Sequence, residues 1–160
     1  MRTPPCLLPV ACVAAVLAGC AMNPPPPSPP APPFMPVADV RELMESVVAH
    51  AAEVYWESVS VVVSQEGVQE NYPETDEEWE EVWAAAMTLA ESGNLLMMEP
   101  RAVDRGPWMG FSAALVNAGV AAAGAALAKD PDRVFEAGEQ VYDVCVACHE
   151  QYISDESLLQ

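Results

Sequence analysis

The segment that decides the fold is residues 130–153, DPDRVFEAGEQVYDVCVACHEQYI. Asp130 followed by Pro131 is a typical helix start, because aspartate accepts hydrogen bonds from free backbone N–H groups and proline is tolerated at the first helical position. The sequence therefore predicts a helix from Pro131 to about Ile153. Near its end lies Cys145-Val146-Ala147-Cys148-His149, a Cys-x-x-Cys-His motif.

This motif is the attachment signature of a c-type haem. Each thiol adds to a vinyl group of the haem, and the adjacent imidazole becomes the proximal ligand of the iron. At about 100° per residue, Cys145, Cys148 and His149 fall in one sector of a helix, so all three can face one flat macrocycle. We therefore expect one covalent haem c, with thioether bonds at Cys145 and Cys148 and with His149 on the iron.

Two other kinds of site use similar residues. A zinc site would need two further ligands, but the other histidine is His50 and the other cysteines, Cys6, Cys12 and Cys20, lie near the N-terminus. A thioredoxin-like redox pair would lie beside a strand, whereas the pattern around this motif favours a helix. Haem attachment is the interpretation that the motif favours.

The N-terminus indicates export. Arg2 precedes an apolar run from Leu7 to Leu17, which is too short to span a membrane and ends in small residues. We predict a signal peptide over residues 1–19. Leu17-Ala18-Gly19-Cys20 resembles the lipobox of bacterial lipoproteins, which implies cleavage before Cys20 and lipid attachment to its thiol. An ordinary signal peptide cut nearby is the alternative.

Lipid attachment would place the protein on the periplasmic side of a bacterial membrane, because several acyl chains anchor stably. The residue after Cys20 is Ala21 rather than aspartate, which by the same resemblance favours the outer membrane. The cysteines are then all assigned, since Cys6 and Cys12 leave with the signal peptide. No disulfide is expected.

Residues 20–36 form the lipidated cysteine and a linker. Nine of the fourteen residues from Asn23 to Pro36 are proline, which favours polyproline II and a reach of roughly 40 Å. We interpret this segment as a stalk, with a proline-motif ligand as the alternative. Residues 37–160 remain for one domain.

Apolar periodicity and helix-start signals predict three further helices in that domain. The first runs from Val37 to about Ser64, and the third from Pro107 to about Ala128. The second begins at Thr75, which forms a capping box with Glu78, and ends or kinks at Ser92-Gly93-Asn94. No strand pair is expected. Four helices with short connections predict an all-α, antiparallel up-down four-helix bundle with haem on the C-terminal helix.

In such a bundle, the start of the first helix and the end of the fourth share one end. Met44 and His149 lie roughly 10 and 6 Å from that end, at nearly the same level. Met44 also belongs to the predicted inward stripe, which comprises Val40, Met44, Val47, Ala51, Val54 and Ser58. Further residues that we expect to line an apolar pocket lie at the same end: Leu43, Leu96, Met97, Met98, Trp108, Met109, Phe111, Tyr142 and Tyr152.

From about Val37 to Ile153 the chain resembles the class II c-type cytochromes, the cytochrome c-prime superfamily. The residues that carry the resemblance are Arg41-Glu42-Leu43-Met44 and Cys145 to Tyr152. The low-spin members use a methionine near the start of the first helix as sixth iron ligand, which implies that Met44 is the distal ligand. A core role for Met44, or ligation by Met97, Met98, Met109 or His50, is the alternative.

Ile153 departs from the family pattern, because many relatives carry a basic residue there that pairs with a haem propionate. Arg41, Arg101 and Arg105 lie toward the same end and are candidate substitutes. The alternative for each is a solvated surface side chain.

With His149 and Met44 on the iron, both axial positions are filled. We therefore expect a carrier of single electrons and not an enzyme. The alternative in the same fold is a five-coordinate haem that binds NO or CO, as cytochrome c-prime members do. An alternative of a different class is an acidic structural lipoprotein without haem.

The chain carries 24 acidic against six basic residues, a net charge of −18. This charge disfavours nucleic acid and anionic headgroups as partners. It fits a redox partner protein with a basic docking surface, although solubility alone also explains it. We expect the chain to contact the membrane through the N-terminal lipid on Cys20. Class II relatives often dimerise through their first two helices, so a homodimer is an alternative to a monomer.

Overall fold

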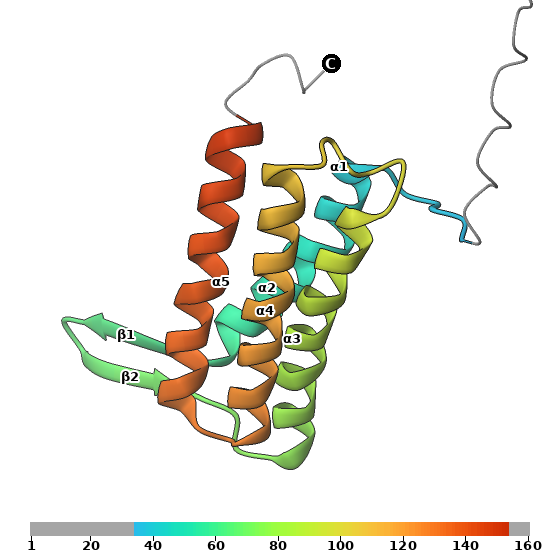
Figure 1. Cartoon of the computed structure of the whole chain (residues 1–160). Coiled ribbons are helices and arrows are strands. Elements are labelled where there is room, and N and C mark those ends of the chain that lie inside the picture. The colour runs from blue at the N-terminus through green and yellow to red at the C-terminus, as the bar shows by residue number, and fades with distance from the viewer. Residues whose placement is uncertain (1–33, 154–160) are drawn as a thin grey trace, which may run out of the picture. The chain divides into compact units, whose positions relative to one another are not determined.

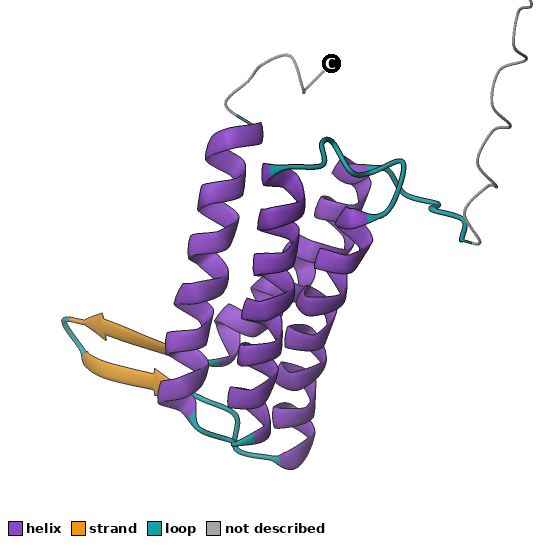
Figure 2. Cartoon of the chain, in the orientation of Figure 1, coloured by secondary structure: helices purple, strands orange, loops and turns teal. Residues whose placement is uncertain are grey.

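The computed structural model describes residues 34–153 (Figure 1). The predicted signal peptide, the predicted lipidation site Cys20 and most of the proline-rich linker lie outside the described residues, as do residues 154–160. The described part is mostly helical, with four helical runs and one two-stranded antiparallel sheet (Figure 2).

The first helical run extends from Val40 to Ser58 in three parts: α1 (Val40–Leu43), a π-helical segment η1 (Met44–Val48) and α2 (Ala49–Ser58). It begins at Val40 rather than Val37 because Asp39 caps it. The Asp39 carboxylate accepts a hydrogen bond of 2.8 Å from the Glu42 N–H. The Glu42 carboxylate accepts one of 3.0 Å from the Asp39 N–H. This reciprocal capping box fixes the start of the run.

The π-helical segment starts at Met44, whose carbonyl accepts the N–H of Ala49 five residues later. The wider turn shifts the apolar face by about one residue from the predicted stripe. The predicted Met44, Val47 and Val54 are half-buried. Of the predicted stripe, Ala51 is fully buried, and the other fully buried positions are Leu43, Val48, Ala52 and Tyr55.

A β-hairpin follows α2, so the expectations of no strand pair and of a first helix reaching Ser64 are wrong, although the mostly helical structure remains compatible with the all-α fold class. Strand β1 (Ser60–Ser64) pairs antiparallel with β2 (Gly67–Asn71). The run Val61-Val62-Val63 explains the change, because consecutive β-branched residues favour a strand over a helix. Gly67 has a φ of +130°, which side-chain-bearing residues rarely adopt, and it closes the turn.

The other three runs are α3 (Asp76–Met97), α4 (Pro107–Leu127) and α5 (Pro131–Tyr152). Their starts confirm the helix-start signals in the sequence. The Thr75 hydroxyl accepts the Glu78 N–H, and the Asp130 carboxylate accepts the Arg133 N–H. However, α3 continues without a break through Ser92-Gly93-Asn94, where we expected an end or a kink.

Gly93 is tolerated within α3 because α4 lies directly against it. A Cβ placed on Gly93 would lie 2.5 Å from the carbonyl oxygen of Ser112. On the facing helix, a Cβ on Gly119 would lie 2.5 Å from the backbone N of Ala90. These glycines let α3 and α4 approach closely, and the α3–α4 contact is the most extensive between any two helices of the described chain.

Helix α4 is the one described helix with the length and hydropathy of a membrane span. It packs against both α3 and α5, and most of its buried residues are alanine, glycine or serine. Of the apolar window of this helix, 44% is buried, so packing against its neighbours explains part of its apolar composition.

The α3–α4 contact predicts opposite effects for two glycine substitutions in α4. Gly119→Ala forces a methyl group into the Ala90 backbone and should lower the free energy of unfolding by about 1–3 kcal/mol. Gly124→Ala is the matched control, because a Cβ there meets nothing within 4 Å. It should raise that free energy by up to about 1 kcal/mol through helix propensity. Urea unfolding followed by circular dichroism measures both, and equal effects would contradict the close approach.

Candidate haem-binding cavity

A cavity of about 660 Å³ lies between the first helical run, α4 and α5. Its size is within the range of cofactor sites. The first run contributes Met44, Val48, Ala49, Ala52 and Trp56 to the lining, and α3 contributes Leu96. Helix α4 contributes Trp108, Phe111, Ser112 and Leu115. The rest comes from the end of α5 and Ile153 after it: Tyr142, Val144, Cys145, Val146, Cys148, His149, Glu150 and Ile153.

The four residues that the sequence singled out for haem attachment and iron ligation all line this cavity. Cys145, Cys148 and His149 lie on α5, whereas Met44 lies on the first helical run. Of the other predicted pocket residues, Leu96, Trp108, Phe111 and Tyr142 also line it. Most of the remaining lining is apolar, as the contact surface of a porphyrin requires.

The two motif cysteines carry free thiols and are half-buried. Burial raises the pKa of the Cys145 thiol. Burial and the neighbouring Cys145 raise the pKa of the Cys148 thiol. Both thiols are therefore protonated at neutral pH. His149 follows them on the same helix and is exposed. Two thiols and one imidazole at the cavity lining are the donor set that a covalently bound haem needs.

Met44 is half-buried at the first position of the π-helical segment. Such segments occur frequently at functional sites, since they re-aim side chains without ending a helix. Within residues 34–153, it is the one methionine that lines the cavity. Met97, Met98 and Met109 lie outside the lining, as does the exposed His50.

Aromatic rings surround the end of α5. The Trp108 indole Nε1 donates to the carbonyl oxygen of Leu96 at 2.8 Å, which fixes the ring at the cavity. The Tyr152 ring contacts Trp108 edge-on, with centroids 5.0 Å apart, and Phe111 with centroids 6.3 Å apart. These edge-to-face contacts hold the last turn of α5 against the start of α4.

Asp104 connects the same two helices through its carboxylate, a role that the sequence analysis missed. It accepts the N–H groups of Gly106 at 2.7 Å and Trp108 at 3.2 Å, and it also accepts the hydroxyl of Tyr152. The Tyr152 hydrogen bond lowers the pKa of Asp104. Partial burial and the same bond raise the pKa of Tyr152 to about 12. An aspartate two residues before Gly106-Pro107, close to a helix start, is a signal that could have identified this residue.

The three candidate propionate contacts lie outside the cavity lining, and each has another partner. Arg101 is buried and donates to the carbonyl oxygens of Ala38 at 2.9 Å and Leu95 at 3.3 Å. Exposed Arg41 pairs with Glu45 at 2.9 Å, and exposed Arg105 pairs with Glu99. A propionate role for these arginines stays a prediction. The observed role of Arg101 is to join the segment before α1 to the end of α3.

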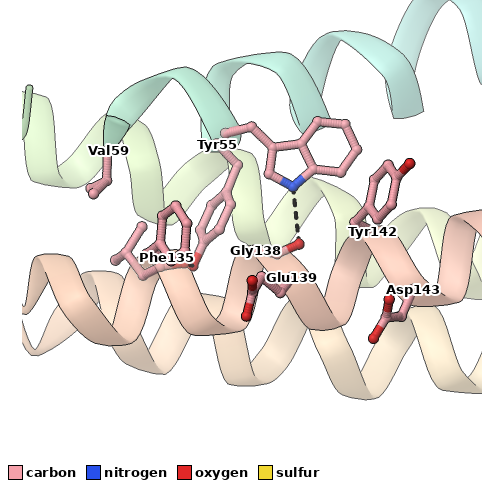
Figure 3. A pocket seen from close by; sticks show the side chains of 9 residues that line it. Tyr55, Val59, Phe135, Gly138, Glu139, Tyr142 and Asp143 are labelled. Carbon is pink, nitrogen blue, oxygen red and sulfur yellow. Dashed lines mark hydrogen bonds between the residues drawn. The ribbon is translucent and has the colours of Figure 1, made fainter. Parts of the chain in front are cut away.

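A second cavity of about 450 Å³ opens beside α2 and α5 (Figure 3). Trp56 and Tyr142 line both cavities, and their rings meet edge-on with centroids 6.1 Å apart. The Trp56 indole donates to the carbonyl oxygen of Gly138 at 3.1 Å. The sequence analysis missed Trp56, because the π-helical segment moves it onto the cavity side of the helix.

No protein-family model matches this sequence, and comparisons with curated proteins and with solved structures found no significant match. Within residues 34–153, no three His, Cys, Asp or Glu side chains group closely enough to hold a metal ion by themselves. The cavity and the residues that line it are therefore the features of this chain that bear on its function.

The hydrogen bond between Asp104 and Tyr152 predicts a pH-dependent stability. Because the folded state lowers the pKa of Asp104 below its usual 3.8, the carboxylate stabilises the fold above that pH. The contribution is lost as the pH falls through the lowered pKa. Asp104→Asn should therefore lower the melting temperature at neutral pH, and the difference in melting temperature from the unmodified protein should narrow as the pH falls below 3.8.

Thermal unfolding followed by circular dichroism at several pH values measures this difference. Asp143→Asn removes an exposed carboxylate from α5 and is the matched control. A difference for Asp104→Asn that stays constant over the whole pH range would contradict the assignment.

Proposed function

We propose that this chain is a membrane-tethered, periplasmic c-type cytochrome that carries single electrons through a His/Met-ligated haem. The observation that carries the proposal is that a single cavity collects Cys145, Cys148 and His149 from α5 and Met44 from the first helical run. These residues lie at opposite ends of the domain's sequence. Their convergence on one cavity is what a doubly ligated haem requires.

The proposed fold is the antiparallel up-down four-helix bundle of the class II c-type cytochromes. Support comes from the four helical runs, from the short connections between α3, α4 and α5, and from the contacts of α3 with α4, α4 with α5 and α2 with α3. The β1–β2 hairpin is then an insertion between the first and second helices of the bundle.

Haem, when bound, supplies reversible one-electron oxidation of its iron. The chain's own residues hold it: Cys145 and Cys148 through thioether bonds, and His149 through its imidazole. The Met44 thioether would be the second side chain to hold the iron, and a thioether ligand raises the reduction potential of a haem. The apolar lining excludes water, and Trp108 and Phe111 enclose the pocket on the α4 side.

With both axial positions occupied by side chains, the iron has no vacant position for a substrate. The proposed role is therefore carriage and not catalysis. The lipid on Cys20 and the proline-rich stalk would confine the carrier to the membrane surface. The strongly acidic chain would favour a redox partner with a basic docking surface.

The proposal predicts haem that survives denaturation. The full chain, matured in a bacterium that attaches haem c, should stain for haem on a denaturing gel, because thioether bonds resist unfolding. The variant with Cys145→Ser and Cys148→Ser should not stain. Cys20→Ser is the matched control, since it should keep the haem while leaving the membrane fraction. An unstained wild-type band would instead favour the acidic structural lipoprotein.

Ligation by Met44 predicts a particular optical spectrum. The ferric protein should show the weak far-red band of methionine-ligated haem, and Met44→Ala should lose it and become high-spin. Met109→Ala should keep the band, because Met109 is half-buried but lies outside the cavity. Retention of the band in Met44→Ala would contradict this ligand. A high-spin wild-type spectrum with NO or CO binding would favour the five-coordinate alternative.

A further inference from the structure

The β1–β2 hairpin projects from the helical body beyond α2 (Figure 1). Every residue from Val61 to Tyr72 is exposed. Four of these are valines: Val61, Val62, Val63 and Val68 are 56, 54, 75 and 63% exposed. A two-stranded hairpin without a covered face is only marginally stable in water, so these valines indicate a surface that is covered by something else.

One face of the hairpin is apolar. Side chains alternate along a strand, so Val61 and Val63 share a face. Their cross-strand neighbours are Glu70, opposite Val61, and Val68, opposite Val63. Three of the four side chains on this face are therefore valine. The opposite face carries Val62 between the two serines of β1.

The outer edge of β1 has no partner strand within residues 34–153. Soluble proteins usually protect such an edge with charged side chains or proline, because free N–H and C=O groups recruit another strand. Strand β1 is Ser60-Val61-Val62-Val63-Ser64 and has neither. The chain has 24 acidic residues, but none lies in this strand. The strand is therefore better suited to pairing with another strand than to exposure to solvent.

The sequence of β1 reads identically in both directions, so antiparallel pairing with the same strand of a second copy would match serine with serine and valine with valine. We propose that β1 pairs antiparallel with β1 of a second copy of this chain, about a two-fold axis at Val62. Ser60 then lies opposite Ser64 of the second copy, Val61 opposite its Val63, and Val62 opposite its Val62. The two hairpins form a four-stranded sheet in which the apolar faces become one continuous stripe.

Charge favours β1 over β2 as the interface. Pairing of two β2 strands about Gln69 would place Glu70 of each copy beside Val68 of the other, which desolvates a carboxylate against an apolar group. Antiparallel pairing of β1 also places the helical bodies at opposite ends of the paired strands. Five residues at about 3.3 Å each separate them by roughly 17 Å, which reduces repulsion between two acidic chains.

This interface does not depend on haem, and it differs from the first-two-helix dimer that the family resemblance suggested. It involves a single hairpin from each copy, so we expect a weak, concentration-dependent dimer. Added salt should strengthen it, because screening reduces the repulsion between the two negative bodies.

Disulfide trapping tests the register directly. Val62→Cys places two thiols at the two-fold axis, where directly opposed Cα atoms lie about 4.5–5.5 Å apart, within disulfide range. Gln69→Cys is the matched control, since Gln69 is the exposed cross-strand neighbour of Val62 on the same face but lies on β2. After mild oxidation of the full chain, Val62→Cys should give several-fold more reducible dimer than Gln69→Cys or wild type. Equal yields would overturn the proposal.

Sedimentation of the full chain over a range of concentrations is the second measurement. Wild type and Gln69→Lys should dimerise as concentration and salt increase, whereas Val62→Lys should stay monomeric with unchanged helical circular dichroism. Two results would overturn the proposal: a wild-type monomer under all conditions, or a dimer that Val62→Lys leaves intact. The latter would place the interface elsewhere, for example on the first two helices.

Discussion

The close approach of α3 and α4 is the constraint on which the remaining structure depends. Gly93 and Gly119 have no Cβ, and a methyl group at either would collide with the facing helix at 2.5 Å. Helix α4 presents small residues to this contact and large ones, including Trp108 and Phe111, to the cavity. The domain is therefore densely packed on one side and hollow on the other. The space that a porphyrin would fill lies between the first helical run on one side and α4 and α5 on the other.

Polar contacts at the end of the domain then fix the residues that face this space. Arg101 joins the segment before α1 to the end of α3, and Asp104 joins the start of α4 to the end of α5. The helices that carry Met44 and His149 are thereby linked to the same short α3–α4 connection. Since an iron centre requires its two axial ligands at a set separation, this connection is the part of the scaffold that would control it.

Local signals in the sequence were sufficient for much of this account. Asp130 and Thr75 marked helix starts correctly, and counting residues from the helix ends brought Met44 to the level of His149. The π-helical segment was not predictable, because a backbone hydrogen bond to the Met44 carbonyl leaves no pattern in the side chains. Gly93 resembled a helix break because its role is a contact with a distant helix. The hairpin, in contrast, could have been predicted from the sequence. Val61-Val62-Val63 favours a strand, and Gly67 favours a turn.

We propose that a porphyrin is covalently joined to α5 and enclosed by the cavity that Met44 completes. Intact-mass spectrometry of the protein, matured in a periplasm with a haem-attachment system, decides between attachment and its absence. The expected mass is that of the processed chain plus one haem, with Cys145 and Cys148 inaccessible to alkylation in the unfolded protein. A mass without haem, with both thiols alkylated, would contradict it.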